Sequence, residues 1–248
     1  IDTSGTAPDH LDTLLQVARQ LGARQLRTYT RHRGTPQEMV EQTIRDLVEA
    51  APLAAAAGVR ILLENHEEFR GSEVARIVEQ VDHPWIGALY DYGNSMMVLE
   101  DPLDALDAMA PHARSAHLKD HVVLAAQDDP DGRLSVLGVP IGQGNLPIVE
   151  ITRRLIRAGL DRILFENVWA YRAPIAEARM SAPDSAQPGA GAFAFAHPPF
   201  VHSRCLPDPE EVAGRDPRQL VEMEDQAMKD ALAWLHRQLQ KAGIALAK

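Results

Sequence analysis

Hydrophobic residues along this chain recur in two alternating patterns. Stretches with apolar residues three or four positions apart predict amphipathic helices over residues 8–21, 36–57, 72–81, 102–109, 146–158 and 217–241. Short apolar runs typical of buried strands lie over residues 25–30, 59–63, 85–90, 114–118 and 162–165. Helices that alternate with strands at this spacing indicate βαβ units, and therefore a parallel sheet buried on both faces.

Four successive predicted strands carry a polar residue at or just after their carboxyl ends: Glu64, Asp91, His117 and Glu166. Barrel enzymes build their active sites from the carboxyl ends of several strands. A doubly wound nucleotide-binding sheet would instead need a glycine-rich turn after its first strand, and the glycines at 138, 142 and 144 follow no such strand. The expected fold class is α/β, in the form of a (β/α)₈ TIM barrel.

Composition and charge narrow the classes of function. The formal net charge of −10 argues against a nucleic-acid partner, whose binding surface would show clustered lysine and arginine. The single cysteine, Cys205, cannot form an internal disulfide, which fits a reducing cytoplasm. No apolar run approaches the ~20 residues of a membrane span, and no signal pattern opens the chain. We therefore expect a cytoplasmic protein without a membrane or nucleic-acid partner.

The four strand-end residues suggest a metal site. Taken singly, each would more often be a helix cap, a loop charge or a structural histidine. Together they are harder to explain in that way, because a barrel points these positions at one axis. Three carboxylates and one imidazole favour a single divalent ion, with Mn²⁺ preferred and Mg²⁺, Co²⁺ or Zn²⁺ as alternatives.

Four segments of the chain resemble the xylose isomerase-like (AP endonuclease 2 type) TIM-barrel superfamily, in its family of sugar phosphate isomerases and epimerases. The segments are Leu63–Glu67, Asp91–Asn94, His117–Asp120 and Phe165–Asn167, in the order and at the separations of that family. The resemblance covers about residues 1–169. It implies that the four strand-end residues named above are the metal ligands.

The resemblance also implies that Glu64 and Glu166 are catalytic. They would flank the substrate and exchange a proton through a metal-stabilised enediolate, because a cation stabilises charge that develops beside a carbonyl and a carboxylate can act as general base. His66 and Lys119 lie at the same rim, where they would bind hydroxyls or steady that charge, or else only orient the ligands. The remaining predicted substrate contacts are Asn94, His121 and Trp169.

Two positions depart from the ketose 3-epimerases of this superfamily. Asn94 stands where those enzymes commonly have a histidine, and Val123 stands where they have an arginine. The substrate contacts of those epimerases therefore do not carry over to this chain.

The resemblance would make Glu64 part of the fifth barrel strand, so that the first strands would precede residue 1. Five strands cannot close a barrel of this type. We expect a single TIM-barrel domain over residues 1–248 that is N-terminally incomplete, or one that a second subunit completes, and a homo-oligomer. Residues 170–208 are rich in proline, alanine and glycine, and are predicted to be a long loop insertion, either a lid or an oligomer contact.

The leading functional prediction is a sugar isomerase or epimerase, with a sugar or glycoside as its small-molecule substrate. A lyase on an oxidised (3-oxo) sugar or glycoside, like a C-glycoside deglycosidase or an inosose dehydratase, would use the same enolate chemistry and would suit an aromatic lid. A DNA-repair endonuclease of this barrel type would need three metals and a basic groove. A non-catalytic binding protein would be expected to have lost a ligand.

Overall fold

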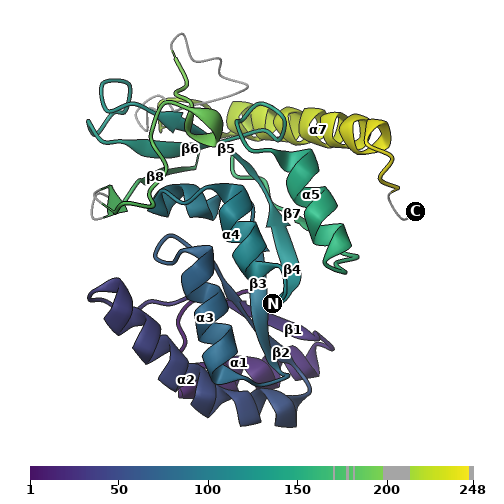
Figure 1. Cartoon of the computed structure of the whole chain (residues 1–248). Coiled ribbons are helices and arrows are strands. Elements are labelled where there is room, and N and C mark those ends of the chain that lie inside the picture. Colours follow the sequence, from purple (N-terminus) through teal and green to yellow (C-terminus); the bar gives the residue numbers. More distant parts are fainter. Residues whose placement is uncertain (170, 177–178, 181, 198–212, 246–248) are drawn as a thin grey trace.

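The computed structural model describes residues 1–169, 171–176, 179–180, 182–197 and 213–245 (Figure 1). Its first half contains α1 (Pro8–Gln20), β1 (Gln25–Thr28), α2 (Pro36–Ala57), β2 (Arg60–Glu64), α3 (Gly71–Val81), β3 (Ile86–Asp91), the 3₁₀ helix η1 (Asn94–Val98), α4 (Pro102–Met109) and β4 (Ala113–Leu118). The second half contains β5 (Asp120–Leu124), β6 (Ser135–Val139), α5 (Ile148–Arg157), β7 (Leu164–Phe165), β8 (Arg172–Pro174), the 3₁₀ helix η3 (Gly191–Phe193) and α7 (Pro217–Lys241).

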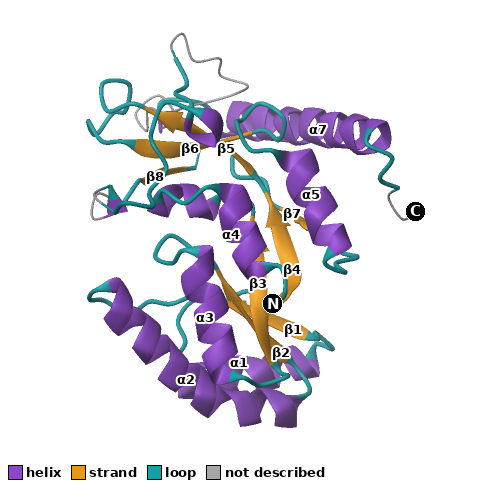
Figure 2. Ribbon diagram, in the orientation of Figure 1, coloured by secondary structure: helices purple, strands orange, loops and turns teal. Residues whose placement is uncertain are grey.

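The larger sheet is parallel, with strand order β1-β2-β3-β4-β7. It curls into a half-barrel, and Figure 2 shows helices packed along the outside of this curved sheet. Both ends of each strand in this sheet lie within two residues of the ends predicted from the sequence. The expected α/β class and barrel architecture are thus confirmed in partial form. None of the helices in the described part of the chain is both long and apolar enough to span a bilayer.

A smaller antiparallel sheet, β5-β6-β8, corrects two expectations. Residues 127–144 are polar and rich in glycine, which predicts a loop with a short hairpin, but the first strand of the hairpin lies earlier, at β5, where only Lys119 separates it from β4. The segment expected to be an irregular insertion at 170–208 supplies β8 and η3, and its residues 198–208 lie outside the described residues. Four buried side chains, two from β5 and two from β6, pack together with Ala196 and account for this sheet: Val122, Leu124, Leu137 and Val139.

The predicted start and end of α2 are confirmed. The Thr35 hydroxyl accepts a hydrogen bond from the backbone N–H of Glu38 (3.3 Å), and the Glu38 carboxylate accepts one from the backbone N–H of Thr35 (2.8 Å). This reciprocal pair satisfies two N–H groups that the first helical turn leaves open. Gly58 ends the helix in the left-handed conformation, with φ of 70°.

Serine is a common helix cap, so the sequence predicts one at Ser72, but α3 begins at Gly71 and its first turn is held by two carboxylates. The backbone N–H of Arg70 donates to Glu73 Oε2 (2.8 Å), and that of Gly71 donates to Glu100 Oε2 (2.6 Å). Glu100 lies between η1 and α4, so this contact ties three elements together. Burial raises the pKa of Glu100 to about 7, although the backbone hydrogen bonds that it accepts act in the opposite direction.

Replacing Glu100 by Gln should change how stability depends on pH. A carboxyl group with a raised pKa in the folded state stabilises the protein below its unfolded pKa, and this contribution is lost as pH rises through about 7. The free energy of unfolding of Glu100→Gln minus that of the wild type should therefore increase from pH 5 to pH 8. The increase should be up to ~3 kcal/mol, because one pKa unit corresponds to ~1.4 kcal/mol.

Denaturant unfolding at pH 5, 6.5 and 8 measures this difference, with Glu49→Gln on the exposed face of α2 as the matched control. A difference between Glu100→Gln and wild type that stays constant over this range would contradict the prediction.

Candidate metal centre

Three neighbouring strand ends bring two carboxylates and an imidazole together. Glu64 is the last residue of β2, Asp91 is the last of β3, and His117 is the last but one of β4. Because these strands are parallel neighbours, their carboxyl ends meet at one edge of the sheet, with Asp91 paired to His117. One ligand atom from each of the three side chains lies within 4.8 Å of the others.

The ring nitrogen Nδ1 of His117 faces three carboxylates. It lies 3.0 Å from Glu64 Oε1, 3.8 Å from Glu166 Oε2 and 4.0 Å from Asp91 Oδ2. Burial would lower the pKa of His117, but the hydrogen bond and charge of Glu64 outweigh it and raise that pKa. Burial would also raise the pKa of Glu64, but the hydrogen bond to His117 and the charge of Arg27 lower it. The ion pair between Arg27 and Glu64 Oε2 holds this carboxylate from the other side.

Lys119 bridges the other two carboxylates. Its Nζ lies 2.7 Å from Glu166 Oε2 and 2.9 Å from Asp91 Oδ2, and it donates a longer hydrogen bond of 3.4 Å to Asn94 Oδ1. Burial would lower the pKa of Lys119, but the charges of Asp91 and Glu166 outweigh it and raise the pKa well above its ordinary value. Burial raises the pKa of Asp91 to about 6, and the charge of Lys119 opposes this rise.

Backbone contacts fix the orientation of Asp91. Its Oδ1 accepts hydrogen bonds from the N–H groups of Gly93 (2.9 Å) and Asn94 (3.0 Å). The buried Asn65 side chain bridges from β2, accepting from the Asp91 N–H (2.7 Å) and donating to the Asp91 carbonyl (3.1 Å). Oδ1 is therefore bound by the backbone of the loop after β3, and Oδ2 is the oxygen directed toward His117 and Lys119.

A cavity of about 430 Å³ adjoins these residues and falls in the size range of small-molecule sites. The side chain of Glu166 is 36% exposed, whereas those of Glu64 and Asp91 are fully buried. Glu166 is thus the carboxylate of the group that opens to the cavity. The lining residues are Arg27, His66, Asn94, Lys119, Glu166, Asn167, Val168, Trp169 and Tyr171.

The structure places most of the predicted contact residues at this cavity. Asn94, Lys119, His66 and Trp169 line it, and His66 is stacked on the Tyr29 ring with 3.8 Å between ring centroids. His121 is different, because it is fully buried and does not line the cavity. Its Nδ1 lies 3.3 Å from the carbonyl oxygen of Gly93, and burial lowers its pKa to about 3. This contact packs His121 against the loop after β3.

Sequence reasoning gave no site role to four residues that line the cavity: Arg27, Asn167, Val168 and Tyr171. A charged residue inside the short predicted strand at 25–30 was the available signal for Arg27, whose side chain is only 14% exposed. Tyr171 lies within the segment interpreted as a loop, and its hydroxyl donates to the Glu67 carboxylate. No local pattern connects Tyr171 with a residue 104 positions earlier.

Asp120 anchors the segment that carries Lys119 and His121. Its carboxylate accepts hydrogen bonds from four backbone N–H groups, those of His121, Gly142, Gly144 and Leu146, at 2.8–3.2 Å. A side chain at Gly144 would lie 2.1 Å from Asp120 Oδ1, so only glycine allows the chain to pass this close. Asp120 therefore joins the start of β5 to the loop before α5.

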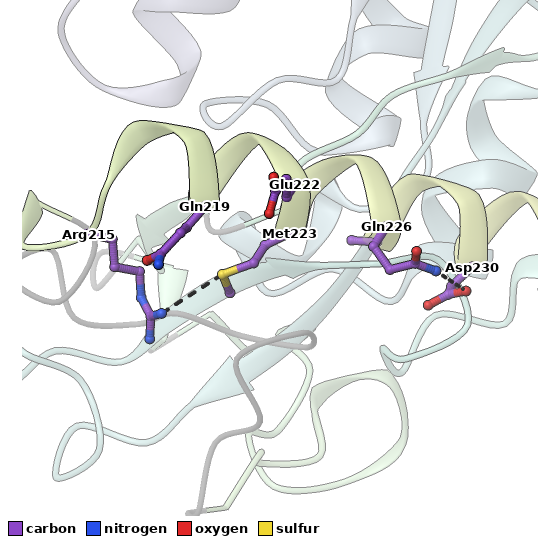
Figure 3. Close-up of a pocket in the computed structure, with 7 residues that line it drawn as sticks. Arg215, Gln219, Glu222, Met223, Gln226 and Asp230 are labelled. Carbon is purple, nitrogen blue, oxygen red and sulfur yellow. Dashed lines mark hydrogen bonds between the residues drawn. The ribbon is translucent and has the colours of Figure 1, made fainter.

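A second cavity, of about 460 Å³, runs along α7 (Figure 3). Two contacts join residues that line it: Gln226 donates to Asp230 (2.9 Å), and Arg215 donates to the Met223 sulfur (3.9 Å). In the part of the chain that the structure describes, metal-ligating side chains converge at Glu64, Asp91 and His117, and not along α7. We therefore place the candidate site at the strand ends.

The residues at the strand ends fit a divalent metal ion. Asp91 Oδ2 and Glu166 Oε2 are buried, and each forms an ion pair with Lys119 Nζ (2.9 and 2.7 Å), which leaves each oxygen a further lone pair for a cation. Carboxylate oxygens together with one imidazole nitrogen form a ligand set that can bind Mn²⁺, Mg²⁺ or Zn²⁺. Glu64, Asp91 and His117 form the tightest cluster, and Glu166 stands at its cavity side.

Comparison with known proteins shows that the chain belongs to the xylose isomerase-like TIM barrel family, whose model matches residues 3–191. The chain is 27% identical over 161 residues to the uncharacterized protein YihM of Escherichia coli K12, covering 65% of this chain and 48% of that protein. It is 28% identical over 120 residues to 3-oxo-isoapionate decarboxylase of Pectobacterium atrosepticum, covering 48% and 43%. The chain thus spans somewhat less than half the length of these curated relatives.

Solved structures agree on the fold. D-psicose 3-epimerase from Clostridium cellulolyticum H10, solved with D-tagatose, superposes with a TM-score of 0.58 at 16% identity, over 92% of this chain and 68% of that one. A xylose isomerase-like TIM barrel protein from Mycobacterium smegmatis, solved with magnesium, gives 0.52 at 19% identity, over 64% and 59%. At these identities the likeness establishes the barrel fold and nothing finer.

Replacing Asp120 by Asn should destabilise the protein. A carboxamide oxygen cannot accept from all four N–H groups, and its NH₂ group would face donors. Each buried donor left unpaired costs about 1–3 kcal/mol, so a loss of at least that size is expected in the free energy of unfolding. Denaturant unfolding at pH 8, with the exposed Asp161→Asn as control, measures it. Equal stability of the two variants would show that Asp120 does not anchor the loop.

Proposed function

We propose that this member of the xylose isomerase-like family is a metal-dependent enzyme that moves a proton next to the carbonyl of a keto sugar, and so isomerises or epimerises it. One observation carries the proposal: the carboxylates of Glu64, Asp91 and Glu166 surround Nδ1 of His117 beside a sugar-sized cavity that Glu166 lines. The family resemblance assigns the same four residues to a metal.

In this proposal Glu64, Asp91, His117 and Glu166 hold one divalent ion, with Mn²⁺ the preferred identity and Mg²⁺, Co²⁺ and Zn²⁺ as alternatives. When bound, the ion would supply Lewis acidity that stabilises negative charge on the carbonyl oxygen of the substrate. The magnesium in the Mycobacterium smegmatis structure supports a divalent ion in proteins of this fold.

The side chains of this protein perform the remaining steps. Glu166 opens to the cavity and acts as the general base that takes a proton from the carbon beside the carbonyl. Lys119, held between Glu166 and Asp91, stabilises the charge that develops. Arg27 keeps Glu64 ionised and oriented through their ion pair. His66 and Trp169 bind the substrate from the cavity wall.

A second candidate is a lyase on a 3-oxo sugar, and one observation favours it. Both oxygens of Glu64 are engaged, Oε1 by His117 and Oε2 by Arg27, and Glu64 does not line the cavity. An epimerase needs proton transfer on both sides of a carbon, whereas a decarboxylating lyase needs only one acid, which protonates the carbon that lost the carboxylate. The curated relative named 3-oxo-isoapionate decarboxylase supports this candidate.

In such a decarboxylation the bond between the carboxylate carbon and its neighbour breaks, and carbon dioxide leaves. The electron pair moves toward the carbonyl oxygen, and a proton then adds to the carbon that lost the carboxylate. Glu166, protonated from solvent, would donate that proton and would be reprotonated by solvent afterwards, so the reaction needs no oxidant or reductant. Mass spectrometry separates the candidates, because an isomer keeps the mass of the substrate and a lyase product does not.

Metal binding tests the first step of the proposal. The purified protein, after chelation and dialysis against Mn²⁺, should retain about one ion per chain by elemental analysis. Asp91→Asn should weaken binding by more than the ~10–100-fold that loss of an outer partner costs, because its NH₂ group would face the ion. Asp82→Asn is the matched control, since Asp82 is exposed with φ of 42°, a conformation that Asn tolerates. Equal metal content in both variants would exclude Asp91 as a ligand.

Replacing Glu166 by Gln tests the base. The variant keeps the shape and one oxygen ligand, so it should retain appreciable metal, but turnover should fall by about 10²–10⁴-fold. Incorporation of solvent deuterium into recovered keto sugar should fall in parallel, because exchange requires the same proton abstraction. Near-normal exchange by the metal-loaded variant would remove Glu166 from the role of base.

A further inference from the structure

The cavity wall carries more hydrogen-bond donors than acceptors. Arg27 and Lys119 line it as permanent cations, and Asn94 and Trp169 add neutral donors. Three of these groups, Arg27 Nε, Asn94 Nδ2 and Trp169 Nε1, are buried and meet no acceptor among the described residues. Asn94 as a whole is only 2% exposed.

Such donors point to the ligand that would occupy the cavity. A buried donor without an acceptor is unfavourable by about 1–3 kcal/mol, so a ligand that supplies acceptor oxygens would gain this free energy on binding. Sugar hydroxyls accept hydrogen bonds but must also donate. A carboxylate only accepts, and it does so at two oxygens, which suits a wall of guanidinium, amide and indole donors.

The charges around the cluster favour the same ligand. Arg27 and Lys119 together offset two of the three carboxylates of Glu64, Asp91 and Glu166. With His117 neutral, as a metal ligand must be, a divalent ion would leave the site with one surplus positive charge. A substrate that brings one negative charge would balance it, whereas a neutral sugar would not.

We propose that the substrate is a sugar acid, a keto sugar whose carboxylate is bound by Arg27, Asn94 and Trp169. The proposal rests on the proposed function for the keto group, but the carboxylate contact is a property of the cavity wall alone. It applies to both an isomerase and a lyase, because it concerns recognition and not the bond that changes.

Calorimetric titration with two matched unreactive probes tests the proposal. D-gluconate and D-glucitol share a six-carbon polyol chain and differ at the first carbon, which is a carboxylate in one and a CH₂OH group in the other. The full chain loaded with Mn²⁺ should bind gluconate at least tenfold more tightly than glucitol. Equal affinities would overturn the proposal.

Two variants separate the cavity wall from direct metal contact. Asn94→Asp replaces the unpaired NH₂ group by an oxygen and should reduce gluconate affinity at least tenfold, while glucitol affinity stays within about twofold. Trp169→Phe removes the indole N–H together with the five-membered ring that carries it, and should act in the same direction. Gln16→Glu makes the same amide-to-carboxylate change on the exposed face of α1 and should leave both affinities unchanged.

Thermal unfolding of each variant, which should stay close to wild type, excludes misfolding as the cause. If Asn94→Asp loses no more gluconate affinity than Gln16→Glu, the carboxylate does not meet this wall and the proposal is wrong. Competition by inorganic phosphate tests the other common anion: displacement of gluconate at equal or lower concentration would assign the wall to a phosphate and overturn the carboxylate.

These results are distinguishable from failure of the proposed function. If gluconate is preferred but no metal binds, the anion site stands and the metal-dependent function fails. If metal binds and neutral keto sugars exchange deuterium without any preference for gluconate, the function stands and the sugar acid proposal fails.

Discussion

Repulsion between buried carboxylates governs the arrangement of the strand ends. Three of them lie within 4.0 Å of a single nitrogen, His117 Nδ1, and two have fully buried side chains. Burial and mutual repulsion both disfavour the charged forms. Arg27 and Lys119 provide the compensating charge, each from a different strand region, and together they leave one carboxylate uncompensated. The need to compensate the carboxylate charge explains why both cations lie beside the cluster, and the two cations give the cavity wall its positive charge.

The two glutamates at the site have different environments, and this difference bears on the chemistry. Glu64 has one oxygen on His117 and the other on Arg27, with no exposed surface. Glu166 is partly exposed and touches Lys119. A carboxylate tied to two partners can hold a metal and an orientation, but it has no free oxygen to accept a proton from substrate. In the proposed function we therefore assign the acid–base work to Glu166 and the holding of the metal to Glu64.

The features that could be predicted from the sequence are those that local patterns of apolar and polar residues determine. Strands β2, β3 and β4 and their terminal residues follow from apolar runs that end in a polar residue, so Glu64, Asp91 and His117 could be named together. The pairing of β8 with β6 and the Arg27–Glu64 ion pair join segments tens of residues apart, and no periodicity records such contacts. The anchoring role of Asp120 was not predicted either, because it depends on four backbone N–H groups, and three of them lie more than twenty residues later in the chain.

Asn94 joins the candidate metal ligands to the cavity. Its backbone N–H holds Asp91 Oδ1, its side-chain oxygen accepts from Lys119, and its side-chain NH₂ faces no acceptor among the described residues. A histidine here, as in the ketose epimerases that the sequence resembles, would bring a ring that can both donate and accept. The amide instead offers a fixed donor beside a cation, because its oxygen already faces Lys119. Under the sugar acid proposal, the asparagine at the start of η1 would favour a carboxylate over a hydroxyl while Asp91 keeps its position.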